Sequence, residues 1–312
     1  LFAKVIVKMN HVAIVSHDAG GAEILSSWLL RSDDLCSVVL EGPAIGIFAR
    51  KCIGAERLTL AEAITKCDWI LCGTGWASDL ERQAIKLGRQ HGKKTIAFLD
   101  HWINYKERFQ EFDGSITLPD EIWVGDEQAK RIAKAAFPNI QVKLQINPYL
   151  EGLRKDLVQI GTNKLPTNKL PTNKVSILYV CEPIREHAYL QYGDERYWGY
   201  TEEDALKYFL ENIESLNLEI SHINIRPHPS ENPNKYHWAK ALAPALIRFG
   251  GAEPLMQETV DADIIVGCES MALVVGLLAG KRVISCIPPS ANPCQLPQPE
   301  IEHMYNLVRM IN

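Results

Sequence analysis

The sequence predicts an α/β protein made of two Rossmann-like domains that face each other across a cleft. Stretches rich in Val, Ile and Leu alternate with amphipathic helical patterns along the chain, which is typical of parallel sheets covered by helices on both faces. Polar clusters follow several of these apolar stretches, at the edge where open α/β sheets bind their ligands. The repeat TNKLPTNKLPTNK, residues 162–174, separates two portions of similar length.

The composition limits the classes of protein to which the chain can belong. Its 312 residues are 46% hydrophobic, which is enough for two ordinary cores. The net charge of -5, without long runs of one sign, disfavours nucleic-acid binding. The 8 cysteines form no CxxC pair, so we expect reduced thiols, a cytoplasmic protein and no bound metal. No apolar run reaches the about 20 residues that span a bilayer, so at most peripheral contact with a membrane is expected.

The first domain is predicted over residues 1–160. Met9 directly precedes a strand pattern, which leaves two interpretations of residues 1–8, a leader or a cloning remnant. Ser78 has the pattern of a helix N-cap, with Glu81 completing a capping box. The predicted strands cover 11–17, 36–42, 68–75, 93–102, 121–126 and 141–147, and the predicted helices cover 22–32, 78–92 and 127–138.

A linker is predicted over residues 161–174 and the second domain over 175–312. The repeat is polar, contains proline and is too short for a solenoid, whose repeats run from about 20 to 50 residues. The predicted strands of the second half cover 174–183, 220–229, 262–270 and 282–289, and the predicted helices cover 202–216, 235–246 and 271–281.

The most informative motif is GCESMALVVGLLAGK, where a strand gives way to an apolar helix. Glu269 and Ser270 stand at the start of that helix. The free N–H groups and the positive dipole end of a helix N-terminus suit a phosphate, and the Ser270 hydroxyl would add a donor. The alternative is that Ser270 is only the N-cap of the helix.

Two further motifs follow strands of the second domain. RPHPSE places Arg226 and His228 after a strand, with prolines that stiffen the backbone. A histidine there can donate to phosphate or act as an acid, and the alternative is a surface turn. In CEPIREH, Glu182 and its charged neighbours either touch a nucleotide or a partner domain, or pack a loop.

The first strand ends in VSHDAGG, which contains His17, Asp18, Gly20 and Gly21. A turn would need only the glycines, which also let the backbone approach a ligand closely. The added His-Asp pair favours a carboxylate that accepts a proton while His17 orients it or contacts a substrate. The alternative is that Asp18 merely caps the helix that follows.

The motif DHWINYKERF groups Asp100, His101, Trp102 and Tyr105 after another strand. Aromatic rings with polar tips beside a carboxylate suit a carbohydrate, which has apolar faces and a rim of hydroxyl groups. The alternative is an amphipathic turn that places Trp102 and Tyr105 in the core. No GxGxxG pattern follows the first strand, so no nicotinamide cofactor is indicated.

RPHPSE together with ADIIVGCESMALVVGLLAGKRVIS resembles the GT-B glycosyltransferases. Within that fold the chain is most similar to the bacterial sialyltransferase, polysialyltransferase and Kdo-transferase families of surface-polysaccharide biosynthesis, and to the related UDP-sugar 2-epimerases. The resemblance implies a GT-B fold and a metal-independent enzyme without a cofactor. This enzyme would move a sugar from a nucleotide-sugar donor, with a CMP-sugar favoured, to a glycan or glycolipid acceptor.

The resemblance matches Asp18 to the acidic motif of these families, His228 to their His-Pro motif and Ser270 to their serine motif. Together with the chemistry of the other motif residues, this leads us to expect the following roles. Asp18 would be the catalytic base, and His228 would stabilise or protonate the leaving phosphate. The donor phosphate would be bound by Arg226, His228, Glu269, Ser270 and Glu182. The acceptor would be bound by His17, Gly20, Gly21, Asp100, His101, Trp102 and Tyr105. Two alternatives stay open, a UDP-sugar 2-epimerase or hydrolase on the same fold and a non-catalytic nucleotide-sugar-binding protein.

Overall fold

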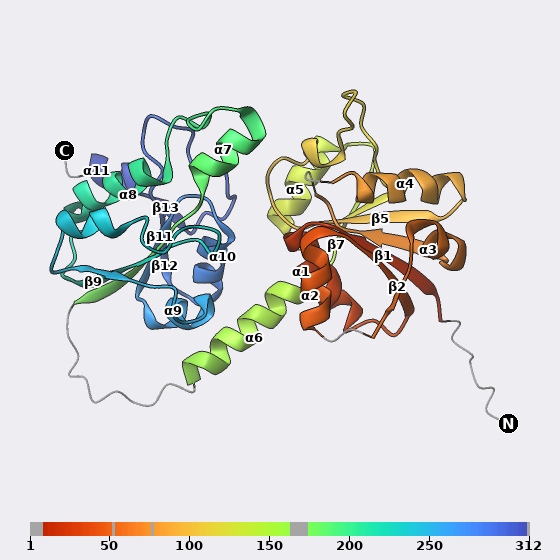
Figure 1. The fold of residues 1–312 in the computed structure, drawn as a ribbon, viewed down its shortest axis with the longest axis horizontal. Helices are drawn as coiled ribbons and strands as arrows, with labels where there is room; N and C mark the ends of the chain where they lie inside the picture. Colours follow the sequence, from red (N-terminus) through yellow and green to blue (C-terminus); the bar gives the residue numbers. More distant parts are fainter. Residues whose placement is uncertain (1–8, 52–53, 76–77, 163–173, 311–312) are drawn as a thin grey trace. The chain divides into compact units, whose positions relative to one another are not determined.

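The computed structural model of the protein describes residues 9–51, 54–75, 78–162 and 174–310. Its contacts divide the chain into two compact units, unit 1 (Leu1–Gly152) and unit 2 (Leu153–Asn312). Each unit has its own sheet with helices packed around it (Figure 1). The two interpretations of residues 1–8 and most of the predicted linker lie outside the described residues.

Unit 1 is built on a seven-stranded parallel sheet with the order β3-β2-β1-β4-β5-β6-β7. This is the Rossmann order, in which the direction of winding reverses between β1 and β4. The strands are β1 (His11–Ser16), β2 (Leu35–Leu40), β3 (Glu56–Arg57), β4 (Trp69–Cys72), β5 (Lys94–Leu99), β6 (Glu121–Val124) and β7 (Gln141–Leu144). The helices are α1 (Ala19–Leu29), α2 (Gly42–Arg50), α3 (Leu60–Lys66), α4 (Leu80–Gln90), α5 (Glu127–Ala136) and the 3₁₀ turn η1 (Glu107–Phe109). The helix α6 (Pro148–Thr162) begins in unit 1 and continues into unit 2.

The residues of unit 1 account for these elements. In β1 every residue after His11 is buried, as expected for a strand covered on both faces. On one side of the sheet Trp28, Trp69 and Trp123 pack against one another, with ring centroids 5.8–6.3 Å apart. Thr59 opens α3 with a complete capping box.

Unit 2 is built on a six-stranded parallel sheet with the order β10-β9-β8-β11-β12-β13, and its winding reverses between β8 and β11. The strands are β8 (Val175–Val180), β9 (Ile220–Arg226), β10 (Ile247–Phe249), β11 (Ile264–Gly267), β12 (Arg282–Ser285) and β13 (Ile301–His303). The helices are α7 (Ile184–Tyr192), α8 (Glu202–Glu211), α9 (Leu255–Asp261), α10 (Met271–Leu278) and α11 (Met304–Arg309), with 3₁₀ turns η2 (Ile213–Leu216) and η3 (His237–Ala241).

The structure corrects several predicted elements. The helix predicted over 235–246 is only the short turn η3, because Pro244 lacks the N–H that would continue a helix. Residues 184–192, which the sequence left as a charged segment or packed loop, form the helix α7, and Gly193 ends it in a left-handed conformation. The helices α2, α3, α6, α9 and α11 were not predicted.

The order of the strands determines which motifs meet. In unit 1 the carboxyl ends of β1, β4 and β5 are neighbours, and in unit 2 those of β8, β9 and β11 are neighbours. The predicted site residues lie at or just after the ends of five of these strands, β1, β5, β8, β9 and β11. Among the described residues no helix is long and apolar enough to cross a membrane, and no group of three or more His, Cys, Asp or Glu side chains is placed to hold a metal ion.

Candidate functional site

The carboxyl edge of the sheet in unit 1 carries a histidine–aspartate dyad. His17 Nδ1 lies 2.6 Å from Asp18 Oδ1, and both side chains are about one-fifth exposed, at 19% and 22%. Asp18 stands at the N-cap position of α1, yet its side chain makes no capping hydrogen bond. The carboxylate therefore does not have the role of an ordinary N-cap, and one of its oxygens is held by the imidazole.

The glycines around the dyad make the space for it. A Cβ atom on Gly75 would lie 2.4 Å from Asp18 Oδ2, and one on Gly42 would lie 2.5 Å from His17 Nε2. A Cβ on Gly20 would lie 1.9 Å from the carboxylate of Asp100. Side chains at these positions would collide with the dyad or with Asp100, so the glycines are needed for reasons beyond the turn.

Glu81 holds the backbone of His17, one residue of the dyad. It is buried, with 4% of its surface exposed, and its Oε1 accepts a hydrogen bond from the backbone N–H of His17 at 2.8 Å. Burial raises the pKa of Glu81 above its ordinary value. The predicted capping box is therefore wrong, because Asp79 is the N-cap of α4 and Glu81 bonds instead to the backbone of His17, directly after β1.

A second polar cluster lies beside the dyad, around Thr74 at the end of β4. Asp100 accepts a hydrogen bond from Arg108 Nη1 at 2.5 Å, and the same nitrogen donates to the Thr74 carbonyl at 2.9 Å. The Thr74 hydroxyl lies 3.3 Å from Asp100 Oδ1. Asp18 and Asp100 thus flank Thr74–Gly75, and Arg108, which has no place in the predicted site, provides the positive charge.

The aromatic residues after β5 follow the core alternative. Trp102 and Tyr105 are 6% and 4% exposed, and the Trp102 indole donates to Asp126 Oδ2 at 2.7 Å. Burial lowers the pKa of His101 to about 4, and its Nδ1 is buried without a hydrogen-bond partner. This burial favours packing over sugar contact for Trp102 and Tyr105, whereas Asp100 lies at the dyad.

In unit 2 a carboxylate bridges the ends of β8 and β11. Glu182 Oε1 accepts hydrogen bonds from the backbone N–H groups of Cys268 and Glu269, both at 2.9 Å. Burial raises the pKa of Glu182 to about 7 against the opposing effect of these hydrogen bonds, and the carboxylate of Glu269 raises it further. The N–H groups that precede α10 therefore hold a carboxyl group of the chain itself.

Ser270 caps α10, as the alternative interpretation expected. Its side-chain oxygen accepts a hydrogen bond from the Ala272 N–H at 3.2 Å. Glu269, beside it, accepts from the Gln295 N–H at 2.5 Å, and burial raises its pKa. Both residues stand at the N-terminal end of α10, beside the N–H groups that bond to Glu182.

Arg226 is engaged within unit 2. Its Nη1 donates to Glu258 Oε2 at 2.8 Å and to the Glu253 carbonyl at 2.7 Å. Glu258 is 8% exposed and also accepts from the Gly251 N–H at 2.6 Å. This arrangement favours a structural role, in which Arg226 ties the end of β9 to α9, over a contact with phosphate.

His228 is half-buried in the loop after β9, and its ring is held on one side. Nδ1 lies 2.8 Å from Ser230 Oγ and accepts from the Ser230 N–H at 3.3 Å. Burial lowers the pKa of His228. Its backbone N–H donates to Glu231 Oε2 at 3.0 Å.

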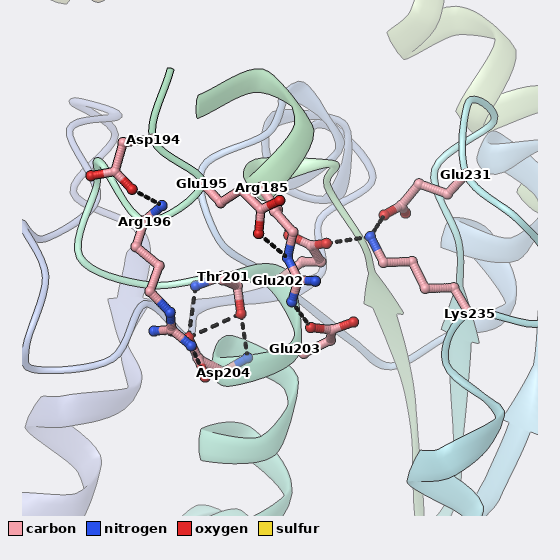
Figure 2. A network of polar contacts seen from close by, with 10 residues as sticks. All are labelled: Arg185, Asp194, Glu195, Arg196, Thr201, Glu202, Glu203, Asp204, Glu231 and Lys235. Carbon is pink, nitrogen blue, oxygen red and sulfur yellow. Dashed lines mark hydrogen bonds and ion pairs between the residues drawn. The ribbon is translucent and has the colours of Figure 1, made fainter. Parts of the chain in front are cut away.

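Glu231 belongs to a network of charged residues that the predicted site did not include (Figure 2). Lys235 contacts the carboxylates of both Glu231 and Glu202, and Glu202 accepts from the Arg185 N–H at 2.8 Å. The only sequence signal for Glu231 was its position three residues after His228, the spacing at which a Glu side chain can reach back to a backbone N–H.

The described part of unit 2 also has a pocket of about 500 Å³ elsewhere, between the segment after β12 and α11. Tyr208, Pro288 and Tyr305 line it, and none of its lining residues belongs to the predicted site. The motif residues therefore form polar clusters on the carboxyl edges of the two sheets, and this pocket is a separate feature of unit 2.

Comparisons with known proteins give similarity at the level of structure alone. No family model matches the chain, and no curated protein matches it. Solved structures do match. The chain is 9% identical to UDP-GlcNAc 2-epimerase from Methanocaldococcus jannaschii, with a TM-score of 0.59, over 96% of this chain and 91% of that chain.

Two further structures show the same similarity. For MnaA from S. aureus in complex with UDP, the identity is 10% and the TM-score 0.57, over 97% of this chain and 87% of that chain. For UDP-N-acetylglucosamine 2-epimerase from Rickettsia bellii, the values are 13% and 0.54, over 89% and 79%. At these identities the comparison concerns the fold. Together with the Rossmann order of both sheets, it confirms that the chain has the GT-B fold of two Rossmann-like domains.

Proposed function

We propose that the chain is an enzyme that acts on nucleotide-activated sugars and transfers the sugar to a hydroxyl group of a glycan or glycolipid acceptor. The observation that carries this proposal is the hydrogen bonding and exposure of the Asp18 side chain. Its carboxylate stands at a helix N-terminus, makes no capping bond and is held by His17 while remaining partly exposed. We place this activity in the cytoplasm, with at most peripheral contact with a membrane.

In the proposed reaction Asp18 accepts the proton of the acceptor hydroxyl as that oxygen attacks the sugar carbon. Asp18 stands at the N-cap position of α1, so the positive end of the helix dipole lies beside its carboxyl group. His17 holds Oδ1, so Oδ2, which faces Gly75, is the oxygen left for the proton. Asp100, which follows β5, and Arg108, which lies in η1, would contact the acceptor.

The donor would bind at the carboxyl edge of unit 2. His228 would donate a hydrogen bond to the phosphate, and the N-terminal end of α10 with Ser270 and Glu269 would lie beside it. Glu182 already occupies two N–H groups of that segment, so it would shape the site rather than contact the phosphate. The proposed mechanism uses no metal and no cofactor. CMP and UDP are the first nucleotides to test, CMP from the sequence motifs and UDP from the structural neighbours.

A second candidate is a sugar-nucleotide 2-epimerase. Two observations favour it, the pair of carboxylates Asp18 and Asp100 on either side of Thr74–Gly75 and the fold shared with UDP-GlcNAc 2-epimerases. An epimerase must remove a proton from a sugar carbon and return one, for which two acid–base groups are suited. Turnover of the donor without any acceptor would identify this reaction, whereas binding without turnover would indicate a non-catalytic protein.

The test of the proposal is the substitution Asp18→Asn, measured with the nucleotide sugar that a thermal-shift screen of CMP, UDP, GDP and CDP selects. Asn preserves the size and hydrogen bonding of the side chain but cannot accept the proton. We expect normal stability, normal donor affinity and a transfer rate reduced about a hundredfold or more.

The matched control is Asp79→Asn, because Asp79 also stands at an N-cap, that of α4, without a capping bond and contacts the side chain of Gln83. This variant should transfer at the wild-type rate. Transfer by Asp18→Asn at close to the wild-type rate would show that Asp18 is not the base.

A further inference from the structure

We propose that Glu231 is a positioning residue for His228, which fixes the loop after β9 so that the imidazole presents its Nε2–H to the anionic group of the ligand. This inference rests on the proposed function for the identity of the ligand. The arrangement of the loop itself is independent of that function, and each can be tested separately.

Both oxygens of Glu231 are engaged although the side chain is only 3% exposed. Oε2 accepts from the His228 N–H at 3.0 Å, and Oε1 accepts from the Tyr236 hydroxyl at 2.8 Å and from Lys235 Nζ at 2.7 Å. A buried carboxylate with these three donors has one favourable position. The backbone N–H of His228 therefore bonds to a carboxyl group whose position is fixed, and not to water.

Lys235 connects Glu231 to two helices of unit 2. Its ammonium group contacts Glu202 at the start of α8, and Glu202 is 2% exposed. The other oxygen of Glu202 accepts from the Arg185 N–H of α7 at 2.8 Å. Figure 2 shows Lys235 between the two carboxylates, with Arg185 on the far side of Glu202. The loop that carries His228 is thus tied to α7 and α8 through Lys235, a partly buried cation between two buried carboxylates.

The pKa values agree with a charged network. Burial alone would raise the pKa of Glu202, but the hydrogen bonds from Lys235 and Arg185 outweigh it and lower that pKa. Burial alone would lower the pKa of Lys235, but Glu202 and Glu231 outweigh it and raise that pKa. At neutral pH Lys235 is therefore charged, and in this state it holds the loop through Glu231 and Glu202.

The neighbours of the imidazole decide which nitrogen bears the proton. A backbone N–H can only donate, so the bond from the Ser230 N–H makes Nδ1 of His228 an acceptor. A neutral imidazole with an accepting Nδ1 has its proton on Nε2. Burial lowers the pKa of His228, and the charge of His187 of α7 lowers it further. The carboxyl groups of Glu231 and of Glu186 of α7 raise this pKa, but they do not outweigh burial. His228 thus offers one donor, Nε2–H, as a phosphate oxygen requires.

The experiment combines a double-mutant cycle with NMR. Nucleotide affinity is measured by calorimetry, with the CMP or UDP that binds the wild type, for Glu231→Gln, His228→Ala and the double variant. We expect Glu231→Gln and His228→Ala each to lose about tenfold in affinity or more, and the double variant to bind no more weakly than His228→Ala alone. A positioning residue has nothing left to act on once His228 is gone.

The ¹⁵N signals of the His228 ring are recorded without nucleotide. In the wild type they should show the Nε2–H tautomer, and in Glu231→Gln they should show a mixture. If the wild type binds none of CMP, UDP, GDP and CDP, the proposed function is wrong. The NMR result still tests whether Glu231 positions His228. The control is Arg196→Gln, whose Arg196–Asp204 pair lies in the same part of unit 2 but contacts neither Lys235 nor Glu231, and it should behave as wild type.

Two results would overturn the inference. One is an unchanged tautomer and an unchanged affinity in Glu231→Gln. The other is a double variant that binds a further tenfold more weakly than His228→Ala, which would mean that Glu231 acts on the fold and not through His228. Should Glu231→Gln not fold, Tyr236→Phe removes one donor from Glu231 at a buried position with little loss of packing, and the same expectations apply to it.

Discussion

At the scale of single residues, the carboxyl edges of both sheets contain carboxylates whose partners determine their chemistry. Asp18 is bonded to an imidazole at a helix N-terminus, whereas Glu182 is bonded to backbone N–H groups in a buried setting. The first is the base of the reaction that we propose. The second holds the strand ends of unit 2 together and has a pKa raised by burial to about 7.

The raised pKa of Glu182 leads to a prediction about stability. Its pKa is about 7 in the folded state and 4.5 ordinarily, so between these pH values the unfolded chain binds fewer protons than the folded chain. The free energy of unfolding should therefore fall as the pH rises from about 4.5 to 7, by at most about 3 kcal/mol because Glu182 keeps some exposed surface.

The variant Glu182→Gln keeps an oxygen that can accept from Cys268 and Glu269 but does not titrate. Urea denaturation at several pH values should show a flatter dependence for this variant than for the wild type. Glu81→Gln, measured in parallel, separates the contribution of the buried carboxylate in unit 1. If the wild type and Glu182→Gln have the same dependence on pH, the carboxylate of Glu182 does not titrate in this range.

At the scale of elements, the sequence of each helix decides where it lies. α10, with the sequence MALVVGLL, is apolar on all sides and packs against β11 and β12, whereas α4 and α5 have one polar face. Gly276 permits this contact, since a Cβ there would lie 2.9 Å from Ile265 and 3.0 Å from Val283. Both neighbours are buried strand residues that cannot move away easily.

We therefore expect Gly276→Ala to lower the free energy of unfolding by about 1–3 kcal/mol, the usual cost of overpacking, although alanine is the better helix former. Gly46→Ala in α2 is the matched control, because a Cβ there would meet nothing within 4 Å. It should raise the stability by up to about 1 kcal/mol. Chemical denaturation measures both, and an equal effect of the two substitutions would contradict the packing argument.

At the scale of the whole molecule, the chain is two Rossmann-ordered sheets in sequence, each with polar motifs at its switch point. The repeat around residues 163–173 lies outside the described residues, and its role as a linker stays a prediction from composition. Deleting one TNKLP unit should change the free energy of unfolding by less than about 0.6 kcal/mol, because the entropy of closing a loop depends only weakly on its length. Loss of soluble protein after the deletion would show that the repeat is part of the packed structure.

The sequence by itself determined the class of fold and the positions of the site motifs. Alternating apolar strands and amphipathic helices follow from hydrophobic periodicity, which is a local property. The polar clusters after β1, β5, β8, β9 and β11 were visible for the same reason. The likeness of RPHPSE and GCESMAL to glycosyltransferase motifs gave the GT-B architecture that the structural comparison confirmed.

Only the tertiary structure decided what each polar side chain contacts. The sequence pattern predicts that Glu81 caps its own helix, whereas it bonds to the backbone of His17 directly after β1. The pairing of Arg226 with Glu258 could not be predicted either. Local sequence patterns contain the spacing of residues along the chain. The partner of a long charged side chain depends on which strands become neighbours, and the crossovers of a parallel sheet bring together residues that are far apart in sequence.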